Sequence, residues 1–329
     1  MSTKDLVLAC LEGKKGDYIS GSAIAAEIGV GRNAVWKAVQ SLCNQGYTIE
    51  SVTGRGYRLS AESDILSAAA VSGYLHTPGI AVEFHQSIDS TNTRAKALGA
   101  AGCPHKTLVV ASAQTAGKGR QGRSFFSPPG TGVYFSLVIR PSFSLEDVSH
   151  ITSYAAVCVA RALEQVYGAS TQIKWVNDVF CNGSKCCGIL TEASLCAETG
   201  QTDYVVVGIG INVSAPAEGF PSEVAGVAGG LDARKDGASR AQLVARVVDL
   251  FFEDYERIPQ RPHLEEYRKR SLLDGRKVRV YEGRSEYDAC VLGINDDFTL
   301  RVRLADGTEH ALTAGEVHIP SSQLGAPQS

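Results

Sequence analysis

The chain has 329 residues, 44% of them hydrophobic, and a formal net charge of −3. At about 150 residues per domain this length predicts two or more domains. The weak negative charge excludes a polyanion-binding field over the whole molecule, so any nucleic-acid contact needs a local basic patch. The nine cysteines are irregularly spaced, no signal-peptide pattern opens the chain, and no run approaches 18 apolar residues. We therefore expect a reduced, cytoplasmic protein without a transmembrane helix.

The first sixty residues have the pattern of a helix-turn-helix followed by a wing. The apolar spacing predicts three helices, over residues 4–15, 23–28 and 32–44. Gly29-Val30-Gly31 is the tight turn between the last two helices, and residues 47–60 predict two short strands around Gly54-Arg55-Gly56. We therefore predict a winged helix-turn-helix domain over residues 1–62.

This N-terminal module is the basic end of an acidic chain. Residues 1–60 contain seven Lys/Arg and five Asp/Glu, a net charge of +2, so the remainder carries −5. Four of the cations fall on the third predicted helix or on the wing: Arg32, Lys37, Arg55 and Arg58. Such a face suits DNA, because it combines phosphate contacts with groove readout. The alternative is a helix-turn-helix kept only for protein docking or for structure.

After a linker at residues 61–64, strands and helices follow one another without regular alternation. We predict six strands, over residues 80–88, 107–114, 132–140, 170–175, 187–194 and 204–213, and three helices, over residues 91–101, 146–168 and 239–257. This order favours an α+β fold with a mixed, largely antiparallel sheet over residues 63–270. Short alternating strands, with turns at residues 295–297 and 306–307, then predict a small β-barrel over residues 271–329.

Residues 116–123, AGKGRQGR, place three glycines and three cations in a loop between two predicted strands. The loop spells G-x-G-x-x-G, but Pro128-Pro129 exclude the helix that must follow a dinucleotide-binding fingerprint. A P-loop is excluded as well, because Gly119 follows Gly117-Lys118 and Ser112 replaces the first glycine. We predict a basic lid that an anionic ligand orders. The alternative is a solvated glycine-rich loop.

Two polar clusters lie near strand ends. Ser90, Thr91 and Asn92 occupy a strand-to-helix junction, where they serve as helix caps or as neutral hydrogen-bonding groups for a urea or amide. In a second cluster, polar Asn177 and Asp178 follow a predicted strand, and a lysine, Lys185, stands at the mouth of an apolar strand. That lysine either lies along the sheet edge or points into a cleft.

A third segment, VVVGIGINV, is a buried strand interrupted by Gly208 and Gly210. These glycines permit close approach of a ligand or neighbouring chain, and Asn212 adds one polar side chain. Three nearby cysteines, at 181, 186 and 187, lack a C-x-x-C pair and a histidine neighbour, so we predict no metal ligands there.

Four segments resemble the motifs of biotin–protein ligases in order and spacing: IDSTN, AQTAGKGRQGRSFFSP, KWVND with KCCGIL, and GIGINV. The segments GVGRNAVWKAVQSL and TGRGYRL resemble the helix-turn-helix and wing of the bifunctional members, which also repress biotin biosynthesis genes. The resemblance covers about residues 4–320. It implies a class II synthetase-like central domain and an SH3-like C-terminal barrel.

The resemblance implies a two-step reaction. The biotin carboxylate attacks the α-phosphate of ATP with Mg²⁺, and a lysine of a biotin carboxyl carrier protein then attacks biotinyl-5′-AMP. Two anions meet in the first step, so clustered cations must offset their repulsion. The implied catalytic residues are Arg120 and Lys185. Those implied for biotin are Ser90, Thr91, Asn92, Gln114, Lys118, Gly119, Arg120 and Lys185, and those for ATP or the adenylate are Lys118, Arg120, Arg123, Asn177 and Asn212.

The bifunctional members further imply a ligand-promoted homodimer that binds a two-fold operator, while the carrier protein competes for the same surface. The side chains then facing DNA are Arg32, Asn33, Trp36, Lys37 and Arg55. The alternative for Trp36 is packing into the core. Two other functions stay open: a ligase whose winged module no longer represses, and a ligand-sensing DNA-binding protein without catalysis. Lipoate ligation is disfavoured, because the arginine-rich glycine loop resembles biotin ligases.

The chain departs from the family pattern at three positions. Lys118 stands where arginine is common, Phe125 where tryptophan is common, and Val176 where proline is usual. Lysine keeps the charge but loses the bidentate fork of arginine. No tryptophan lies between residues 213 and 230 to cover an adenine, so the candidates for that contact are Phe220, or Val224 with Val227.

Overall fold

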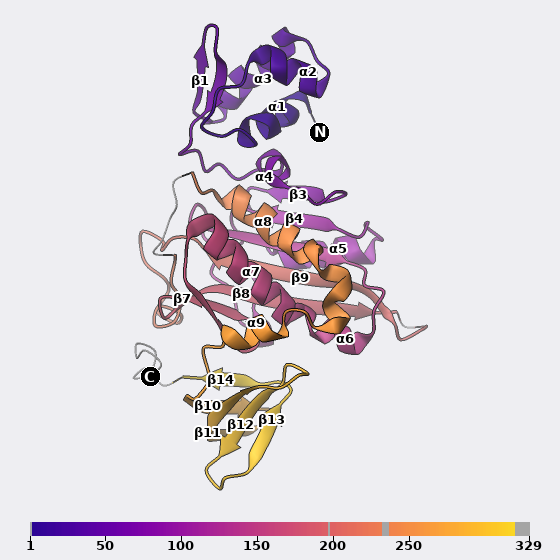
Figure 1. Ribbon diagram of the computed structural model, residues 1–329, viewed down its shortest axis with the longest axis vertical. Helices are drawn as coiled ribbons and strands as arrows, with labels where there is room; N and C mark the ends of the chain where they lie inside the picture. Colours follow the sequence, from indigo (N-terminus) through magenta and orange to yellow (C-terminus); the bar gives the residue numbers. More distant parts are fainter. Residues whose placement is uncertain (1, 197, 232–236, 320–329) are drawn as a thin grey trace.

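The computed structural model describes residues 2–196, 198–231 and 237–319. Three units follow one another along the long axis: a helical N-terminal module, a central sheet covered by helices, and a C-terminal sheet (Figure 1). The predicted α+β class is confirmed, whereas the domain boundaries after residues 62 and 270 stay predictions. In the described parts of the chain, no helix is both long and apolar enough to cross a membrane.

The N-terminal module is the predicted helix-turn-helix with a two-stranded wing. Its elements are α1 (Thr3–Glu12), α2 (Gly21–Ile28), α3 (Arg32–Asn44), β1 (Ile49–Val52) and β2 (Gly56–Leu59). The first helix was predicted to reach residue 15, which is wrong. Gly13 caps it, and the chain turns at Gly16, whose φ of 87° lies in the left-handed region. Gly29 ends α2 in the same conformation, with φ 69°, and so creates the turn before α3.

The central sheet has seven strands in the order β3-β4-β5-β9-β8-β7-β6. Within this described sheet, β3 pairs with β4 in parallel and every other pair is antiparallel, so the predicted mixed topology is confirmed. The strand β7 was not predicted separately. The bounds are β3 (Ala81–His85), β4 (Thr107–Ala111), β5 (Gly132–Ile139), β6 (Thr171–Lys174), β7 (Asp178–Cys181), β8 (Ser184–Leu195) and β9 (Thr202–Asn212).

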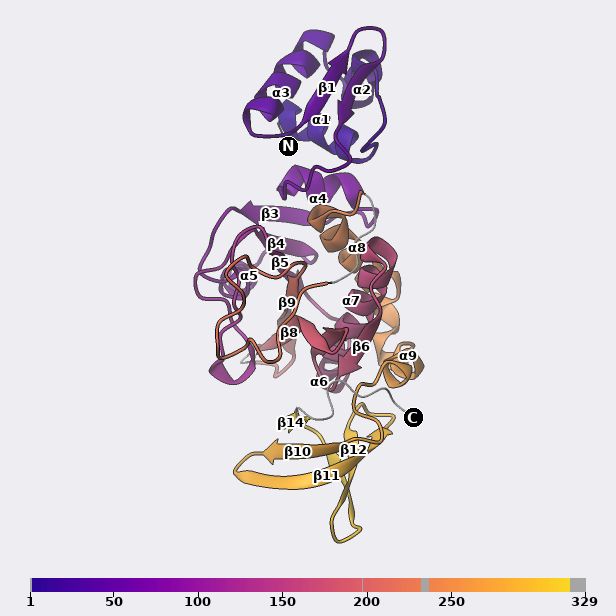
Figure 2. The ribbon, with the colours of Figure 1, turned by 90° about the vertical axis from the view of Figure 1, so that its left-hand side faces the viewer.

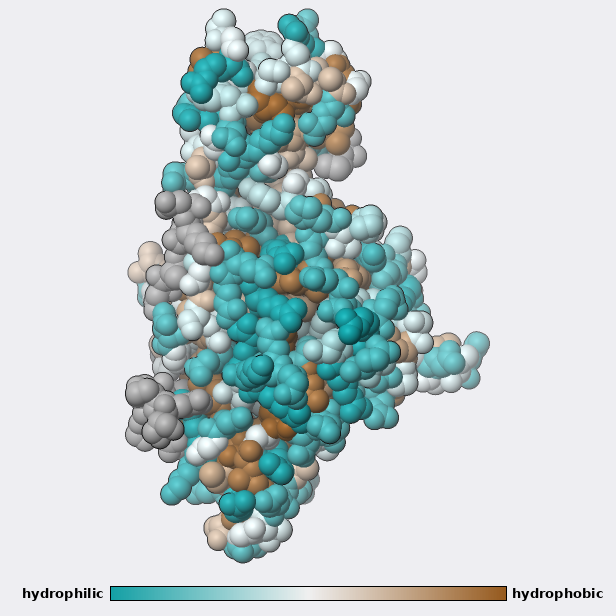
Figure 3. Space-filling view, viewed as in Figure 1, coloured by the Kyte–Doolittle hydropathy of each residue, from teal (hydrophilic) through white to brown (hydrophobic). Residues whose placement is uncertain are grey.

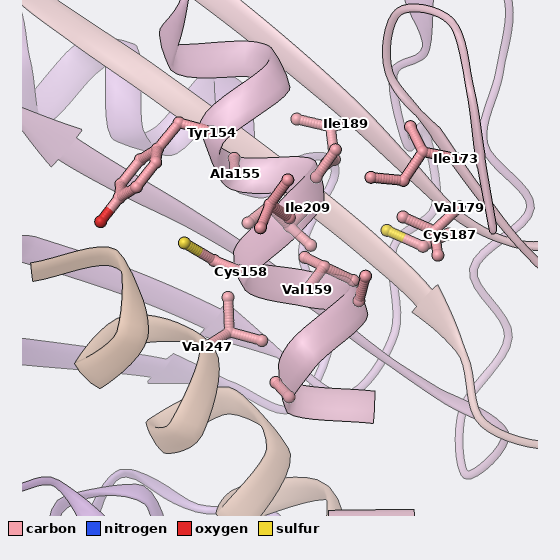
Figure 4. Packing of buried hydrophobic residues seen from close by; sticks show 14 of the residues in the cluster. Tyr154, Ala155, Cys158, Val159, Ile173, Val179, Cys187, Ile189, Ile209 and Val247 are labelled. Carbon is pink, nitrogen blue, oxygen red and sulfur yellow. The ribbon is translucent and has the colours of Figure 1, made fainter. Parts of the chain in front are cut away.

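One face of this sheet packs on α7 (Ile151–Tyr167) and α8 (Arg240–Glu253). Figure 4 shows Val159 of α7 and Val247 of α8 among strand side chains such as Ile189 and Ile209. Outside this core, the visible surface of the central unit is mainly hydrophilic (Figure 3). Because side chains alternate between faces along a strand, Gly208 and Gly210 of β9 lie on the opposite face from the core residues Val205, Val207, Ile209 and Ile211.

The remaining helices are α4 (Ala68–Tyr74), α5 (Thr91–Ala100), α6 (Leu145–Ser149), a 3₁₀ turn (Tyr255–Gln260) and α9 (Leu264–Lys269). Neither α4 nor α9 was predicted. The helix predicted over residues 146–168 is wrong as one element, because α6 and α7 meet at His150, whose buried ring packs against Phe298. The helix predicted to residue 257 ends at Glu253, since Asp254 leaves helical geometry with φ −121°.

The C-terminal unit is an antiparallel five-stranded sheet in the order β13-β12-β11-β10-β14, which confirms a small β domain. Its strands are β10 (Lys277–Glu282), β11 (Ser285–Ile294), β12 (Leu300–Leu304), β13 (Glu309–Leu312) and β14 (Glu316–His318). Alternating residues such as Val278, Val280 and Val302 are buried. Trp175 of the central unit donates its indole N–H to the carbonyl of Phe298 at 2.8 Å, which ties the two units together.

Candidate active site

A cavity of about 490 Å³ opens on the sheet face opposite α7 and α8. Its floor comes from β8 and β9, and its walls come from the start of α5, the basic loop, residues 220–228 and β14. The segment after β9 crosses in front of the sheet in Figure 2. Each of the residues that the sequence predicted for biotin or ATP lines this one cavity. Tertiary folding therefore brings together segments that lie more than a hundred residues apart.

The floor is shaped by the two glycines of β9. A Cβ on Gly208 would lie 1.8 Å from Oδ1 of Asn92, and a Cβ on Gly210 would lie 2.6 Å from the ring of Phe125. Both distances are far below van der Waals contact, so only glycine lets these side chains reach the sheet. Phe125 also packs edge-on against Tyr134, with ring centroids 6.3 Å apart. The glycines thus admit protein side chains as well as creating the cavity.

The IDSTN segment forms a neutral hydrogen-bonding cluster. Ser90 caps α5, and Thr91 donates its N–H to Oε1 of Gln114 at 2.8 Å. Ser136 of β5 lies 2.8 Å from Oγ1 of Thr91 and 2.6 Å from Oδ1 of Asn92. The segment therefore caps a helix and forms a polar cluster at the same time, while binding of a urea or amide stays a prediction. Ser136 was missed, because a buried serine within an apolar strand has no distinctive pattern in the sequence.

The basic loop connects β4 to β5 and makes a tight turn at its cations. A 3₁₀ turn spans Arg120–Gly122, and Gln121 inside it has φ 55°. The Gly119 N–H donates to the carbonyl of Arg123 at 2.7 Å, which closes the turn. No α-helix follows the loop, in agreement with the rejection of a dinucleotide fingerprint. The side chain of Lys118 is exposed to solvent.

Away from the IDSTN cluster, the cations Arg120 and Lys185 each pair with a polar side chain of the cavity lining. Arg120 donates to Oδ1 of Asn177 at 3.0 Å. Lys185 lies 2.7 Å from a carboxylate oxygen of Asp178. Lys185 therefore points into the cavity, and the alternative of a lysine lying along the sheet edge is wrong.

Two charged residues at this end, Glu316 and Lys174, were missed from the sequence. Arg123, expected at the phosphates, forms an ion pair with Glu316 of β14. Lys174 ends β6 and lines the cavity beside it. Burial lowers the pKa of Lys174; the neighbouring Asp178 acts in the opposite sense, and Lys185 lowers it further. The KWVND motif contains this lysine, but the face of the sheet from which its side chain projects is decided only by the pairing of β6 with β7.

The segment after β9 supplies an apolar wall. Phe220, Val224 and Val227, the candidates for an adenine contact, all line the cavity. The backbone of this segment pairs with the start of β8, since the N–H of Lys185 donates to the carbonyl of Val227 at 2.7 Å. The apolar wall therefore lies directly beside the cationic residues. Among the described residues, no group of three or more His, Cys, Asp or Glu is placed to hold a metal ion.

The predicted DNA-facing residues form an exposed surface on the N-terminal module. Arg32, Asn33, Trp36 and Lys37 are exposed on α3. The side chain of Trp36 is 53% exposed, so the alternative of core packing is wrong. On the wing, the guanidinium of Arg55 lies 4.2 Å from the ring centroid of Tyr18. The helix face and wing tip thus present cations and one large aromatic group to solvent.

Comparison with known proteins agrees with this arrangement. The profile of the Biotin/lipoate A/B protein ligase family matches residues 84–212, and that of an HTH domain matches residues 4–58. The bifunctional ligase/repressor BirA of Bacillus subtilis (strain 168) is 34% identical over 304 residues, which cover 91% of this chain and 93% of that protein. The chain belongs to the bifunctional ligase/repressor family. The family's Escherichia coli (strain K12) member is 27% identical and covers 94% of this chain and 95% of its own length.

A solved structure supports the fold. The biotin protein ligase from Aquifex aeolicus in complex with biotin and ATP superimposes with a TM-score of 0.60 and 24% sequence identity. The match covers 73% of this chain and 98% of the Aquifex chain. This chain therefore has the fold of the Aquifex protein over about three quarters of its length.

Proposed function

We propose that the protein is an ATP-dependent biotin–protein ligase that also represses transcription. It activates biotin as biotinyl-5′-AMP and transfers the biotinyl group to a lysine of a biotin carboxyl carrier protein. One observation carries the proposal: a single cavity is lined by a neutral hydrogen-bonding cluster around Thr91 and by a cationic cluster around Arg120 and Lys185. A ligand with an uncharged polar head and an anionic end matches this combination.

The neutral cluster suits the ureido ring of biotin, which has N–H donors and a carbonyl acceptor. Thr91, Asn92 and Gln114 offer hydroxyl and amide groups that are already held by one another, by Ser136 or by Ser127. The hydroxyl of Ser90 accepts a hydrogen bond from the N–H of Thr93. Preorganised polar groups lose little entropy when they bind a ligand. Gly208 leaves room for the amide of Asn92 to lie against the sheet within this cluster. We assign the biotin head to this part of the cavity.

The cationic cluster suits the first chemical step. A carboxylate oxygen of biotin attacks the α-phosphorus of ATP, and the bond to the β-phosphate oxygen breaks and releases pyrophosphate. Arg120 and Lys185 neutralise the two reacting anions and the charge that develops at phosphorus, while Lys118 and Arg123 assist at the phosphates. Asn177 holds the guanidinium of Arg120 in place. Catalysis therefore depends on positioning and electrostatics, without a covalent enzyme intermediate.

Mg²⁺ fits this site as a companion of ATP. Magnesium is usually bound by one or two carboxylates together with substrate phosphates and water. Asp178, which pairs with Lys185 in this structure, would supply a carboxylate, and Asn177 and Asn212, which line the same cavity, would supply amide oxygens. When bound, the ion neutralises phosphate charge during displacement.

The second step is acyl transfer. The uncharged amine of the carrier lysine attacks the acyl carbon of biotinyl-5′-AMP, AMP leaves, and the amine loses its proton to solvent. A closed basic loop keeps water away from the mixed anhydride until the carrier arrives. A relative in Paracoccus denitrificans, 39% identical over 128 residues, is named biotin–[acetyl-CoA-carboxylase] ligase. A carboxylase carrier domain is therefore the acceptor that we propose.

For repression we propose that the adenylate promotes a homodimer, which binds a two-fold operator through α3 and the wing. The exposed Arg32, Asn33, Trp36, Lys37 and Arg55 are the proposed contacts. A dimer matches the symmetry of paired half-sites. The second candidate is a ligase whose winged module no longer represses, since the module's charge excess is only +2 over residues 1–60.

Transfer to a carrier domain tests the enzyme. The protein is incubated with biotin, Mg-ATP and a biotin carrier domain, and labelling of the carrier lysine is measured. Absence of transfer would rule out the ligase. Footprinting of the promoter of a biotin biosynthesis gene, with and without biotin and ATP, tests the repressor. Protection that depends on both ligands is expected, whereas identical patterns with and without ligand would argue against a ligand-controlled repressor.

A further inference from the structure

Lys174 occupies the place where the cavity meets the C-terminal unit. It is the last residue of β6, and its backbone is paired in register with Asp178 of β7. Residues paired directly across two antiparallel strands project from the same face. The cavity lining around Lys174 includes Glu316 and His318 of β14. Lys174 therefore faces a cavity that the central sheet and β14 line together.

The ammonium of Lys174 differs from other cations of the cavity in having no polar partner. Lys185 is paired with Asp178, Arg120 with Asn177, and Arg123 with Glu316. Across residues 2–196, 198–231 and 237–319, no side chain or carbonyl forms a hydrogen bond or ion pair with the ammonium of Lys174. The side chain is nevertheless partly buried.

Partial burial of Lys174 disfavours its charged form, and no protein group of the described residues offsets this by pairing with the ammonium. Burial also lowers the pKa of Lys174, and Lys185 and Arg123 lower it further, against the opposing effects of Asp178 and Glu316. An anionic group that enters this part of the cavity supplies the missing partner. The nearest protein carboxylates are already engaged by other cations. Lys174 is therefore available to an anionic ligand group in the cavity.

We propose that Lys174 binds the β- and γ-phosphates of ATP and the pyrophosphate that leaves in the first step. The inference rests on the proposed ligase function. It adds Lys174 to the proposed phosphate-binding residues, a role that neither the sequence motifs nor the comparisons assign to it. Arg120 and Lys185 hold the α-phosphate, and the tail of the nucleotide then runs toward β14. As the bond from the α-phosphorus to the β-phosphate oxygen breaks, its electron pair moves to pyrophosphate. Lys174 offsets that added charge and transfers no proton.

The test uses the full chain and separates the two half-reactions. Biotin-dependent ATP–pyrophosphate exchange reports the first step, and transfer from preformed biotinyl-5′-AMP to a carrier domain reports the second. Lys174→Met and Lys174→Gln remove the charge, and Lys174→Arg keeps it. Lys277→Met is the matched control, because Lys277 is exposed on β10 and does not line the cavity. Thermal denaturation of each variant verifies its fold. Two neutral replacements are used so that the test still gives a result if one of them misfolds.

A charge-assisted hydrogen bond contributes enough affinity that the KM values for ATP and pyrophosphate are expected to rise about 10-fold or more in Lys174→Met and Lys174→Gln. Lys174→Arg and Lys277→Met are expected to stay close to the wild type. Transfer from preformed adenylate is expected to stay unchanged in all four variants. Unchanged KM values in folded neutral variants, or an equal loss in both half-reactions, would overturn the assignment. A wild-type protein without biotin-dependent exchange refutes the proposed function itself and the inference with it.

Discussion

Replacing Glu12 with glutamine is expected to remove most of the pH dependence of the contact between α1 and α4. Glu12 ends α1 with only 2% of its surface exposed, and Tyr74 of α4 donates a hydrogen bond to its carboxylate at 3.0 Å. Burial raises the pKa of Glu12 from 4.5 to about 7. Nearby Lys15 and the hydrogen bond from Tyr74 oppose this rise, and Asp64 adds to it. The N-terminal module is thus attached through a carboxyl group that ionises near neutral pH.

The sign of the effect follows from the two protonation equilibria. Glu12 titrates near 4.5 in the unfolded chain and near 7 in the folded protein, so the folded state binds this proton more tightly. The resulting stabilisation is fully present below pH 4.5 and is lost as the pH rises through 7. At about 1.4 kcal/mol for each pKa unit, the separation corresponds to about 3 kcal/mol. About 2.5 kcal/mol of this falls between pH 5 and pH 8.5.

Native-state hydrogen exchange of the α1 and α4 amides measures this contact directly, whereas unfolding of a chain with three units is not a two-state process. Glutamine still accepts the hydrogen bond from Tyr74 but does not ionise. Wild type and Glu12→Gln are compared at each pH, so intrinsic exchange rates cancel. The wild type is expected to lose about 2.5 kcal/mol more protection than the variant between pH 5 and pH 8.5. Glu62→Gln, exposed in the linker, should follow the wild type. Equal pH dependence in wild type and Glu12→Gln would refute the reasoning.

Three further predictions concern the site and the DNA-facing surface. Gly208→Ala places a Cβ 1.8 Å from Oδ1 of Asn92, so the Asn92 side chain must move away from Ser136. Calorimetry is expected to show that biotin binding is weakened by about 10-fold or more. Unchanged affinity would exclude Asn92 from the biotin site. Arg120→Gly is expected to release the adenylate and biotinylate bystander lysines, seen as biotin on added albumin, and full selectivity for the carrier would contradict the role of Arg120. Trp36→Ala is expected to weaken operator binding in gel-shift assays without changing carrier biotinylation. The reason is that Trp36 is exposed on α3 of the N-terminal module and does not line the cavity. An unaltered gel shift would remove Trp36 from the DNA contacts.

Local patterns were sufficient to predict the type of most elements. The turn at Gly29 and the alternation in the C-terminal strands depend on neighbouring residues, and the structure agrees with both. The prolines after the basic loop excluded a dinucleotide-binding helix for the same reason, since their effect on φ is local. The short helices α4 and α9 were missed. Each has at most seven residues, so each depends on tertiary packing for its stability.

The sequence by itself named the residues predicted to bind ligands, and each of them lines the same cavity, although their roles stay predictions. Tertiary structure alone decided which charges meet. Arg123 pairs with Glu316 from a strand almost two hundred residues away, and Lys174 lies beside them without a partner. The same holds for Glu12, whose burial against Tyr74 no local pattern reveals. Ion pairing and burial depend on distances between segments that are remote in the chain, and these distances exist only after the sheets and helices have packed.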